Sequence, residues 1–307
     1  MAALPFIMLR LGIVDFDSSH CIEFTRRFNA RGVTQDQCVA GARVILGWPG
    51  DSTVAPQRIP GFEQQMVECG VELVASPLAM LGKIDGVLIL SLGGEVHLER
   101  ARPFLEAGLP TYIDKPFTCT QSDARTLVNL ATQHNSTLFA TSALRYSDDV
   151  DQFAAISRRA GATLGAVVHG PGHQHPSNPG LLHYGIHAVE VLYTLMGTGC
   201  AWLHSCHTEH AEVVTGQWSD GRTGTIRVAR RGDTRYGFQA FCEQGIVQRP
   251  VSTRFAYRNL CREMVTSFQS GRPAVNPSTT LEILSFITAA FRSQQAHGAR
   301  VELEFVD

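Results

Sequence analysis

The stretch DGVLILSLGGEVHLERARPFLEAGLPTYIDKPF, residues 85–117, decides the fold class of this 307-residue chain. Residues 85–92 form a mainly apolar run, which is typical of a strand buried on both faces of a parallel sheet. Residues 95–108 have helical spacing and end at a glycine, and residues 110–114 form a second short strand. The stretch therefore predicts two parallel strands joined by a right-handed helical crossover.

The same alternation continues on both sides of this stretch. Strands and helices that take turns with short links predict a doubly wound, mostly parallel sheet. We therefore expect an α/β Rossmann domain of the dinucleotide-binding type over residues 1–144. Its expected strands are 9–14, 42–48, 71–76, 85–92, 110–114 and 136–144, and its expected helices are 20–32, 61–70, 95–108 and 120–135.

The pattern changes after Arg145. A long stretch with strand-like alternation and turn signals is flanked by helices, which predicts helices packed on an antiparallel sheet. We therefore expect residues 145–307 to form an α+β domain with a mostly antiparallel sheet. Its expected helices are 149–159, 181–197, 257–270 and 278–297, and its expected strands are 164–170, several within 201–251, and 300–305.

The composition is that of a globular protein that binds neither nucleic acid nor a membrane. The net charge is −2 without a long charge run, and no apolar run approaches the ~20 residues of a membrane span. Residues Met1 to Met8 are apolar but too short for a secretory signal. The eight cysteines are scattered without a Cys-x-x-Cys pair, so we expect reduced thiols and a cytoplasmic location.

Lys115 stands directly after the second strand of the opening stretch. Ligands of open α/β sheets bind outside the carboxyl ends of the strands. A lysine at that edge can hydrogen-bond a substrate oxygen or stabilise developing negative charge. The alternative interpretation is a solvated loop lysine, since most lysines lie on the surface.

Two histidines and an acid share a helical spacing in HYGIHAVE. His183, His187 and Glu190 stand at i, i+4 and i+7, so we expect them on one helix face. A histidine near an alcohol can accept its proton during oxidation. The alternative is a buried helix face whose histidines are hydrogen-bonded.

The loop before this helix, residues 171–180, carries His173 and His175. With His183 and His187 these side chains have spacings that could hold a metal ion. They could equally line a polar substrate pocket. Both interpretations remain open at the level of the sequence.

The opening loop, RLGIVDFDSSH at residues 10–20, departs from a glycine-rich dinucleotide fingerprint. Asp15 and Asp17 stand where glycines would let a pyrophosphate approach the backbone. An aspartate at a helix start also competes with phosphate for the same N–H donors. Donors that a phosphate could use follow directly, at Ser18, Ser19 and His20.

The end of the second strand is also unusual for a dinucleotide site. A ribose-binding acid is expected roughly 20 residues past the glycine loop. Gly47 and Trp48 stand there instead, and Asp51 follows only after a turn. Trp48 could stack on an adenine or lie in the core, and the choice between NAD and NADP stays open.

The chain resembles the Gfo/Idh/MocA (glucose-fructose oxidoreductase / inositol dehydrogenase) oxidoreductases over nearly its whole length. Residues 85–117 resemble the family's fourth strand, following helix, fifth strand and Glu-Lys-Pro signature, here Asp114-Lys115-Pro116. Residues 181–197 resemble its substrate-domain helix, and residues 259–303 its C-terminal helix pair.

The resemblance implies an NAD(P)-dependent oxidoreductase that transfers a hydride between nicotinamide and a carbinol carbon of a sugar or polyol. Lys115 and His187 match the catalytic lysine and histidine, and His183 falls where the family usually has aspartate and could itself relay the proton. Arg145 falls near the family's arginine at the domain junction, and we expect it to bind substrate with His173 and His175. The expected cofactor-binding residues are Asp15, Phe16, Asp17, Ser18, Ser19, His20, Ser91, Leu92, His97, Asp114, Lys115 and Pro116.

The resemblance also implies a homo-dimer or homo-tetramer that forms through the open face of the second-domain sheet. Residues 223–229 and 236–242 have apolar side chains on one face that could serve this contact. Two other functions remain open. One is the same fold without ordinary redox turnover, as a sugar-binding or lyase-type protein with a weakly or tightly held nucleotide. The other is metal-assisted hydrolysis through the histidines.

Overall fold

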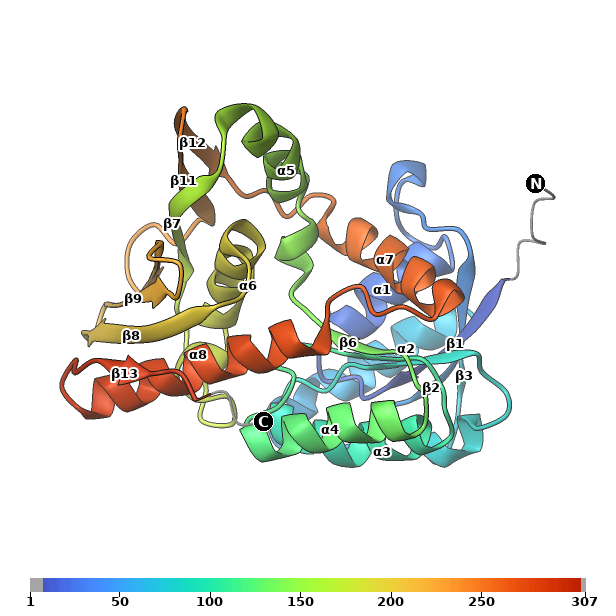
Figure 1. The fold of residues 1–307 in the computed structure, drawn as a ribbon. Helices are drawn as coiled ribbons and strands as arrows, with labels where there is room; N and C mark the ends of the chain where they lie inside the picture. The colour runs from blue at the N-terminus through green and yellow to red at the C-terminus, as the bar shows by residue number, and fades with distance from the viewer. Residues whose placement is uncertain (1–7, 305–307) are drawn as a thin grey trace. The chain divides into compact units, whose positions relative to one another are not determined.

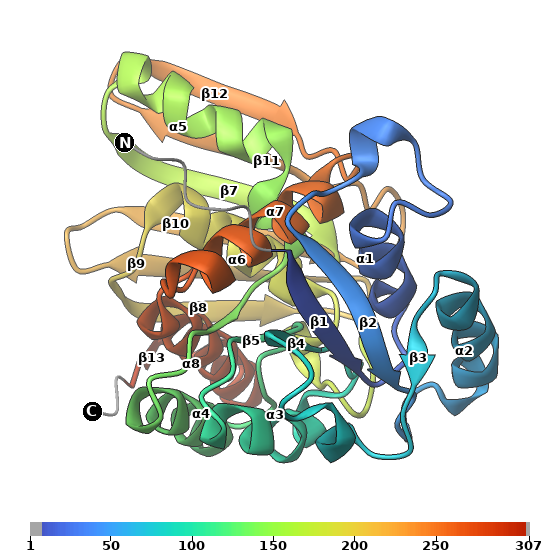
Figure 2. The ribbon, with the colours of Figure 1, turned by 90° about the vertical axis from the view of Figure 1, so that its right-hand side faces the viewer.

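A six-stranded parallel sheet forms the centre of the first of two units in the computed structural model, which describes residues 8–304. The strand order is β3-β2-β1-β4-β5-β6, so the order reverses between β1 and β4 (Figure 2). The expected doubly wound sheet is confirmed. Its strands are β1 (Leu9–Val14), β2 (Ala42–Trp48), β3 (Glu72–Leu73), β4 (Gly86–Ile89), β5 (Thr111–Ile113) and β6 (Leu138–Ala140).

Four helices accompany these strands in the order that the sequence predicts. They are α1 (His20–Phe28), α2 (Ile59–Glu68), α3 (His97–Glu106) and α4 (Gln121–Gln133). The helices α3 and α4 pack beside each other, as do α1 and α2 (Figure 1). All four residues of β4 are buried, as expected for a strand covered on both faces.

A fifth helix of the first unit comes from far along the chain. The first unit runs to Ala140 and also includes Tyr257–Pro277, which contains most of α7 (Ala256–Ser270). Phe268 of α7 contacts Phe139 of β6 edge to face, with ring centroids 6.3 Å apart. The sequence predicts this helix but assigns it to the domain 145–307, because apolar spacing does not say which sheet a helix covers.

The second unit comprises Thr141–Ala256 and the chain from Ser278 onward. Its seven-stranded sheet has the order β12-β11-β7-β10-β9-β8-β13, and only the β7–β10 pair is parallel. The expected mostly antiparallel sheet is therefore confirmed. Its strands are β7 (Thr163–Pro171), β8 (Cys200–His207), β9 (Ala211–Trp218), β10 (Thr223–Ala229), β11 (Gly237–Cys242), β12 (Gly245–Pro250) and β13 (Val301–Glu302), and its helices are α5 (Asp148–Ala160), α6 (Gly185–Met196) and α8 (Pro277–Gln295).

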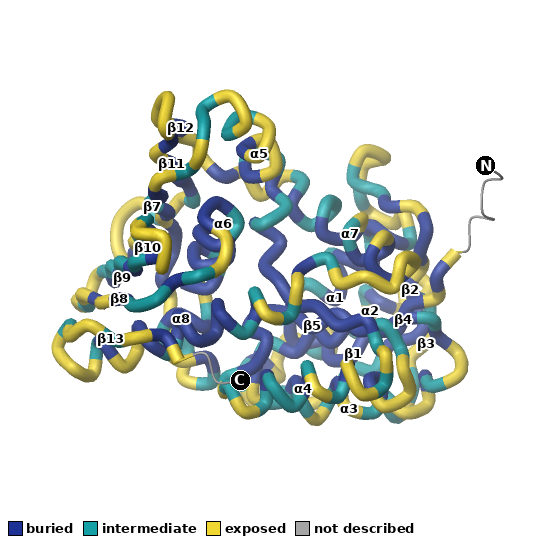
Figure 3. The backbone as a smooth tube through the Cα atoms, viewed as in Figure 1, coloured by how far each residue is buried: buried dark blue, intermediate teal, exposed yellow. Residues whose placement is uncertain are grey.

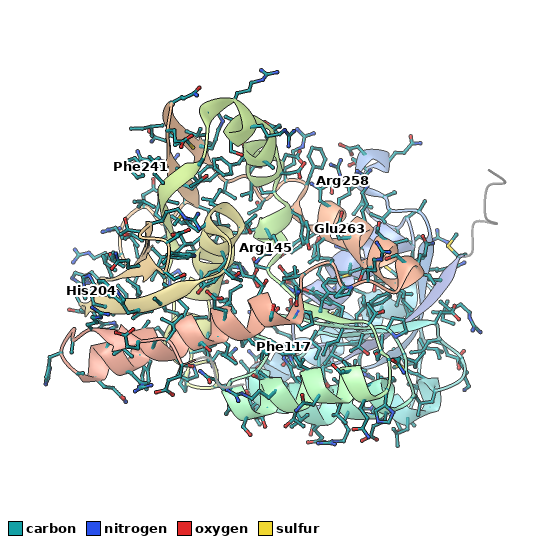
Figure 4. The ribbon with its side chains drawn as sticks, viewed as in Figure 1. Phe117, Arg145, His204, Phe241, Arg258 and Glu263 are labelled. Carbon is teal, nitrogen blue, oxygen red and sulfur yellow. The ribbon has the colours of Figure 1, made fainter. Side chains whose placement is uncertain are left out.

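One face of this sheet is covered by helices, and it takes the apolar side chains of β10 and β11. Ile226 and Phe238 are buried, and Phe238 contacts Phe153 of α5. The helix α6, which packs on β7 and β10, is itself mostly buried (Figure 3). The opposite face of β10 carries the exposed Arg227, while Phe241 of β11 is partly exposed at 37 % (Figure 4). The apolar side chains of the segment 223–229 thus lie under the helices. This corrects the expectation that they face outward and form a contact between subunits.

Within residues 8–304, no helix has both the length and the apolar character that crossing a membrane requires.

Candidate active site

The loop after β1 keeps the backbone of a glycine turn while carrying an aspartate. Asp15 has φ 68°, the left-handed conformation that glycine adopts most easily and that aspartate tolerates better than most residues. The next side chain, Phe16, is fully buried and points toward β2, where a Cβ at Gly47 would lie 2.5 Å from its ring. Phe16 is therefore a core residue and not a ligand contact.

The carboxylates of Asp15 and Asp17 turn into the space at the carboxyl ends of β1 and β4. Asp15 Oδ2 accepts a hydrogen bond from Ser91 and pairs with Arg100 Nε at 3.3 Å. Asp17 accepts the Leu92 N–H at 2.9 Å on one oxygen and the Ser52 hydroxyl at 2.5 Å on the other. Burial raises the pKa of Asp15 to about 7 and raises that of Asp17, against the lowering effect of these hydrogen bonds.

A pocket of about 240 Å³ lies beside these carboxylates. Arg100 is the only cation of its lining, and its guanidinium already pairs with Asp51 and Glu99 and lies 4.8 Å from the Trp48 ring centroid. Trp48 therefore stacks on an arginine from α3 rather than lying free for an adenine. The lining residues are Asp17, Asp51, Ser52, Thr53, Val54, Ser91, Gly93, Glu95, Val96, Glu99 and Arg100.

The sequence analysis expects His20 and Asp114 to bind the cofactor. In the structure the two side chains pair with each other. The His20 Nδ1 lies 2.6 Å from Asp114 Oδ2, its Nε2 lies 3.1 Å from the Tyr257 hydroxyl, and Tyr112 donates to the other Asp114 oxygen. Burial alone would raise the pKa of Asp114, but His20 and Lys115 beside it hold that pKa at about 2. Both side chains are thus engaged within the first unit, where they fix the loop that carries Lys115.

Lys115 follows β5 and Asp114, at the carboxyl edge where the sequence predicts it. The residue is 8 % exposed, and its amine forms no hydrogen bond with any described residue. The loop is held close to the one after β4, since a Cβ at Gly94 would lie 2.8 Å from the Pro116 ring. Lys115 is therefore positioned by its neighbours while its own donors stay available.

His97 ties the same two loops together from inside. It is completely buried, with Nε2 2.9 Å from the Ser91 carbonyl and Nδ1 3.1 Å from the Phe117 carbonyl. Both ring nitrogens are thus occupied by backbone oxygens. This arrangement corrects the expectation that His97 contacts a cofactor.

The residues at this edge fit a dinucleotide through their backbone, and two of their side chains oppose it. The left-handed turn at Asp15, the start of α1 and the reversal of strand order are the features that cradle a pyrophosphate. Ser18 and Ser19 stand at that helix start, where Ser18 Oγ accepts the His20 N–H. The carboxylates of Asp15 and Asp17, however, hold hydroxyl, N–H and guanidinium donors of the kind that a phosphate would use.

In the second unit, His187 lies in the first turn of α6. Its Nδ1 is 2.6 Å from the Ser142 hydroxyl, and its ring contacts Tyr184 and Tyr236 edge to face. The Ser142 contact fixes the orientation of the imidazole through one nitrogen.

Arg145 does not have a free guanidinium for a substrate. Its Nη2 and Nε lie 2.6 Å and 2.9 Å from the same Glu190 oxygen, which also accepts the Thr141 hydroxyl at 3.1 Å (Figure 4). Glu190 is 3 % exposed. The pair therefore ties the segment before α5 to α6, which corrects the expectation that Arg145 binds substrate directly.

His183 is outside the helix on which the sequence places it. The chain makes a short 3-10 turn at Gly180–Leu182, and α6 begins only at Gly185, so His183 and His187 do not share a helix face. The His183 ring contacts His175 at 5.4 Å and Tyr184 at 5.0 Å, and His173 contacts Tyr184 at 5.5 Å. The histidines thus form one aromatic cluster around Tyr184.

Across residues 8–304, no three His, Cys, Asp or Glu side chains are grouped so as to hold a metal ion.

Sequence reasoning missed four residues of these sites. Ser142 and Tyr236 position His187, Tyr184 joins the histidines, and Arg100 is the cation beside Asp15. Tyr184 stands inside HYGIHAVE and could have been found there. Ser142, Tyr236 and Arg100 come from distant segments, and no local pattern marks them.

The sequence matches one family model, described as "Oxidoreductase family, NAD-binding Rossmann fold" (GFO_IDH_MocA), over residues 54–142. The match includes Lys115 and begins after the loop that carries Asp15 and Asp17. No curated protein matches the chain.

Solved structures share the fold over almost the whole chain. GenD2 from gentamicin A biosynthesis in complex with NAD is 17% identical, with a TM-score of 0.77, and 97% of each chain is covered. A putative myo-inositol dehydrogenase from Sinorhizobium meliloti is 16% identical, with a TM-score of 0.79 and coverage of 97% of this chain and 100% of that one. Scyllo-inositol dehydrogenase from Lactobacillus casei, with bound NAD(H) and scyllo-inositol, is 15% identical, with a TM-score of 0.78 and coverage of 96% and 99%.

Proposed function

We infer that this chain, whose residues 54–142 match the Gfo/Idh/MocA oxidoreductase family model, transfers a hydride between a nicotinamide and a carbinol carbon of a sugar or polyol. The observation that carries this proposal is the setting of Lys115. The residue follows β5 at the carboxyl edge of the Rossmann sheet, is 8 % exposed, and forms no side-chain hydrogen bond with the described residues. When bound, the nicotinamide supplies the hydride acceptor or donor.

We assign Lys115 to the oxygen of the reacting carbinol. Its ammonium donates a hydrogen bond to that oxygen and stabilises the negative charge that develops there as the proton leaves. The neighbouring Asp114 carboxylate, whose pKa is held at about 2, remains charged beside Lys115.

We assign His187 to the proton of the same hydroxyl. The Ser142 contact at Nδ1 orients the ring, so that Nε2 accepts the proton during oxidation and returns it during reduction. The Glu190 carboxylate is neutralised by Arg145 and is not a second base in this scheme.

The cluster of His173, His175, His183 and Tyr184 suits a substrate with several hydroxyl groups. Imidazole and phenol groups both donate and accept hydrogen bonds, so that they can pair with polyol oxygens from either side. The inositol dehydrogenases with the same fold act on such a polyol according to their names. We therefore propose a cyclic polyol or sugar as the substrate class.

Lys115→Met tests the assignment of the lysine. We expect kcat to fall by about 10²- to 10³-fold, because the developing charge loses its donor, while the dissociation constant of NAD measured by titration calorimetry changes little. Lys83→Met is the matched control, because Lys83 is exposed, and should keep both values. Equal losses of cofactor affinity and turnover in Lys115→Met would make Lys115 a binding residue instead.

We also propose a reducing cytoplasm and a homo-dimer or homo-tetramer through the open face of the second sheet. No disulfide links any of the eight cysteines, all of which lie among the described residues, and this suits a reducing compartment. Light scattering on the purified protein would measure the assembly, and a monomer at micromolar concentration would contradict it.

A further inference from the structure

We propose that the Asp15 and Asp17 carboxylates occupy the place of a cofactor's pyrophosphate, so that dinucleotide binding must displace them and takes up protons. The affinity for a nicotinamide dinucleotide then rises as the pH falls. This inference rests on the proposed function, since it concerns the cofactor of that site.

The hydrogen bonds at the carboxyl edge support this reading. Ser91 and Arg100 hold Asp15, while Ser52 and the Leu92 N–H hold Asp17. A carboxylate and a phosphate oxygen use the same donors, because each is a charged acceptor. While the carboxylates hold these donors, a pyrophosphate cannot have them.

The charge of the pocket adds to this competition. Four carboxylates line it, from Asp17, Asp51, Glu95 and Glu99, against the single guanidinium of Arg100. That guanidinium pairs with Asp51 and Glu99, and also with Asp15, a residue that does not line the pocket. A pyrophosphate that enters with two negative charges meets unfavourable Coulomb energy until a carboxyl is neutralised or moves away.

Asp15 is the group best placed to take up a proton. It is 1 % exposed, and its Oδ1 has no hydrogen-bond partner among the described residues. Arg100 and His97 from α3 act on the two carboxyls, and Asp15 and Asp17 act on each other. The other titratable groups near them are the lining carboxyls of Asp51, Glu95 and Glu99 and the Cys21 thiol of α1. Burial raises the pKa of Asp15 to about 7, so that added negative charge nearby would draw a proton onto it close to neutral pH.

Titration calorimetry with NAD and NADH tests the proposal on the whole purified chain. In wild type we expect binding to be up to about tenfold tighter at about pH 6 than at about pH 8, because Asp15 with a pKa of about 7 is mostly protonated at the lower pH and mostly charged at the higher one. Titrations at about pH 8 in two buffers of different ionisation enthalpy should give a net uptake of about one proton per cofactor. This second readout needs no variant and so does not depend on any variant folding.

Asp15→Asn and Asp17→Asn assign the effect to residues. Asparagine tolerates the left-handed backbone at position 15 and keeps an acceptor for Ser91 without the charge. We expect Asp15→Asn to bind about tenfold tighter than wild type at about pH 8 and to lose the proton uptake. Glu106→Gln, which removes one exposed charge at the far end of α3, is the matched control and should behave as wild type.

The outcomes separate this inference from the proposed function. Tight wild-type binding without proton uptake, unchanged in Asp15→Asn, would overturn the inference and leave the dehydrogenase proposal intact. Failure of wild type and of both Asn variants to bind any nicotinamide dinucleotide would overturn both.

Discussion

At the scale of single residues, Asp15 combines two features that seldom occur together. Its backbone has the positive φ that a dinucleotide loop needs, and its side chain fills the space that a glycine would leave open. The sequence predicts the position and the conflict with phosphate. It cannot predict the partners, because Ser91 lies in the loop after β4 and Arg100 in α3, 76 and 85 positions further along the chain.

The raised pKa of Asp15 has a consequence for stability. Its folded-state pKa of about 7 lies above the ordinary value of 3.8, so the native state holds a proton that the unfolded chain releases. The contribution of Asp15 to the free energy of unfolding is therefore greatest below about pH 4 and is lost as the pH rises through about 7. The full difference is about 4 kcal/mol, at about 1.4 kcal/mol per pKa unit.

Asp15→Asn should remove this dependence. Urea unfolding of both proteins between about pH 5 and about pH 8 would show wild type losing stability relative to Asp15→Asn as the pH rises. A constant difference between the two proteins over this range would contradict a raised pKa. Glu106→Gln again serves as the control for loss of one exposed charge.

At the scale of elements, the strands and helices of the Rossmann unit follow from hydrophobic periodicity. The misplaced element is the turn before α6. The spacing of His183, His187 and Glu190 reads as one helix, but the helix begins at Gly185 and the preceding residues form a separate 3-10 turn. Periodicity cannot register such a break, because the apolar residues continue through it.

The Arg145–Glu190 pair joins this helix to the segment before α5, and it is buried on both sides, with side-chain exposures of 12% and 3%. We expect Glu190→Ala to lower the free energy of unfolding by about 3–5 kcal/mol, because it leaves a buried guanidinium unpaired. The double variant Arg145→Met with Glu190→Met should recover much of this loss. Urea unfolding measures both.

The exposed pair Arg300–Glu302 provides the control for this experiment. Its side chains are 57% and 64% exposed, and Glu302→Ala should change the free energy of unfolding by less than about 1 kcal/mol. Equal effects of Glu190→Ala and Glu302→Ala would contradict the structural role of the buried pair.

At the scale of the whole molecule, the sequence predicts two domains of the right classes and misses how the chain is shared between them. The helix α7 returns to the first unit, where Tyr257 contacts His20 and Phe268 contacts Phe139. These are contacts between residues more than a hundred positions apart, and a single sequence contains no direct record of them. A local motif carries the proposed positions Lys115 and His187, whereas no local pattern marks Ser142, which lies 45 positions from its partner His187.

The proposed reaction is hydride transfer between a carbinol carbon of a sugar or polyol and nicotinamide. Polyols and sugars deuterated at the carbinol carbon, incubated with wild type and NAD near pH 6, test it most directly by mass spectrometry of the recovered cofactor. The account predicts deuterium on the nicotinamide ring with at least one cyclic polyol or sugar, and its loss in Lys115→Met. Absence of label on the cofactor with every substrate, at saturating NAD, would contradict it.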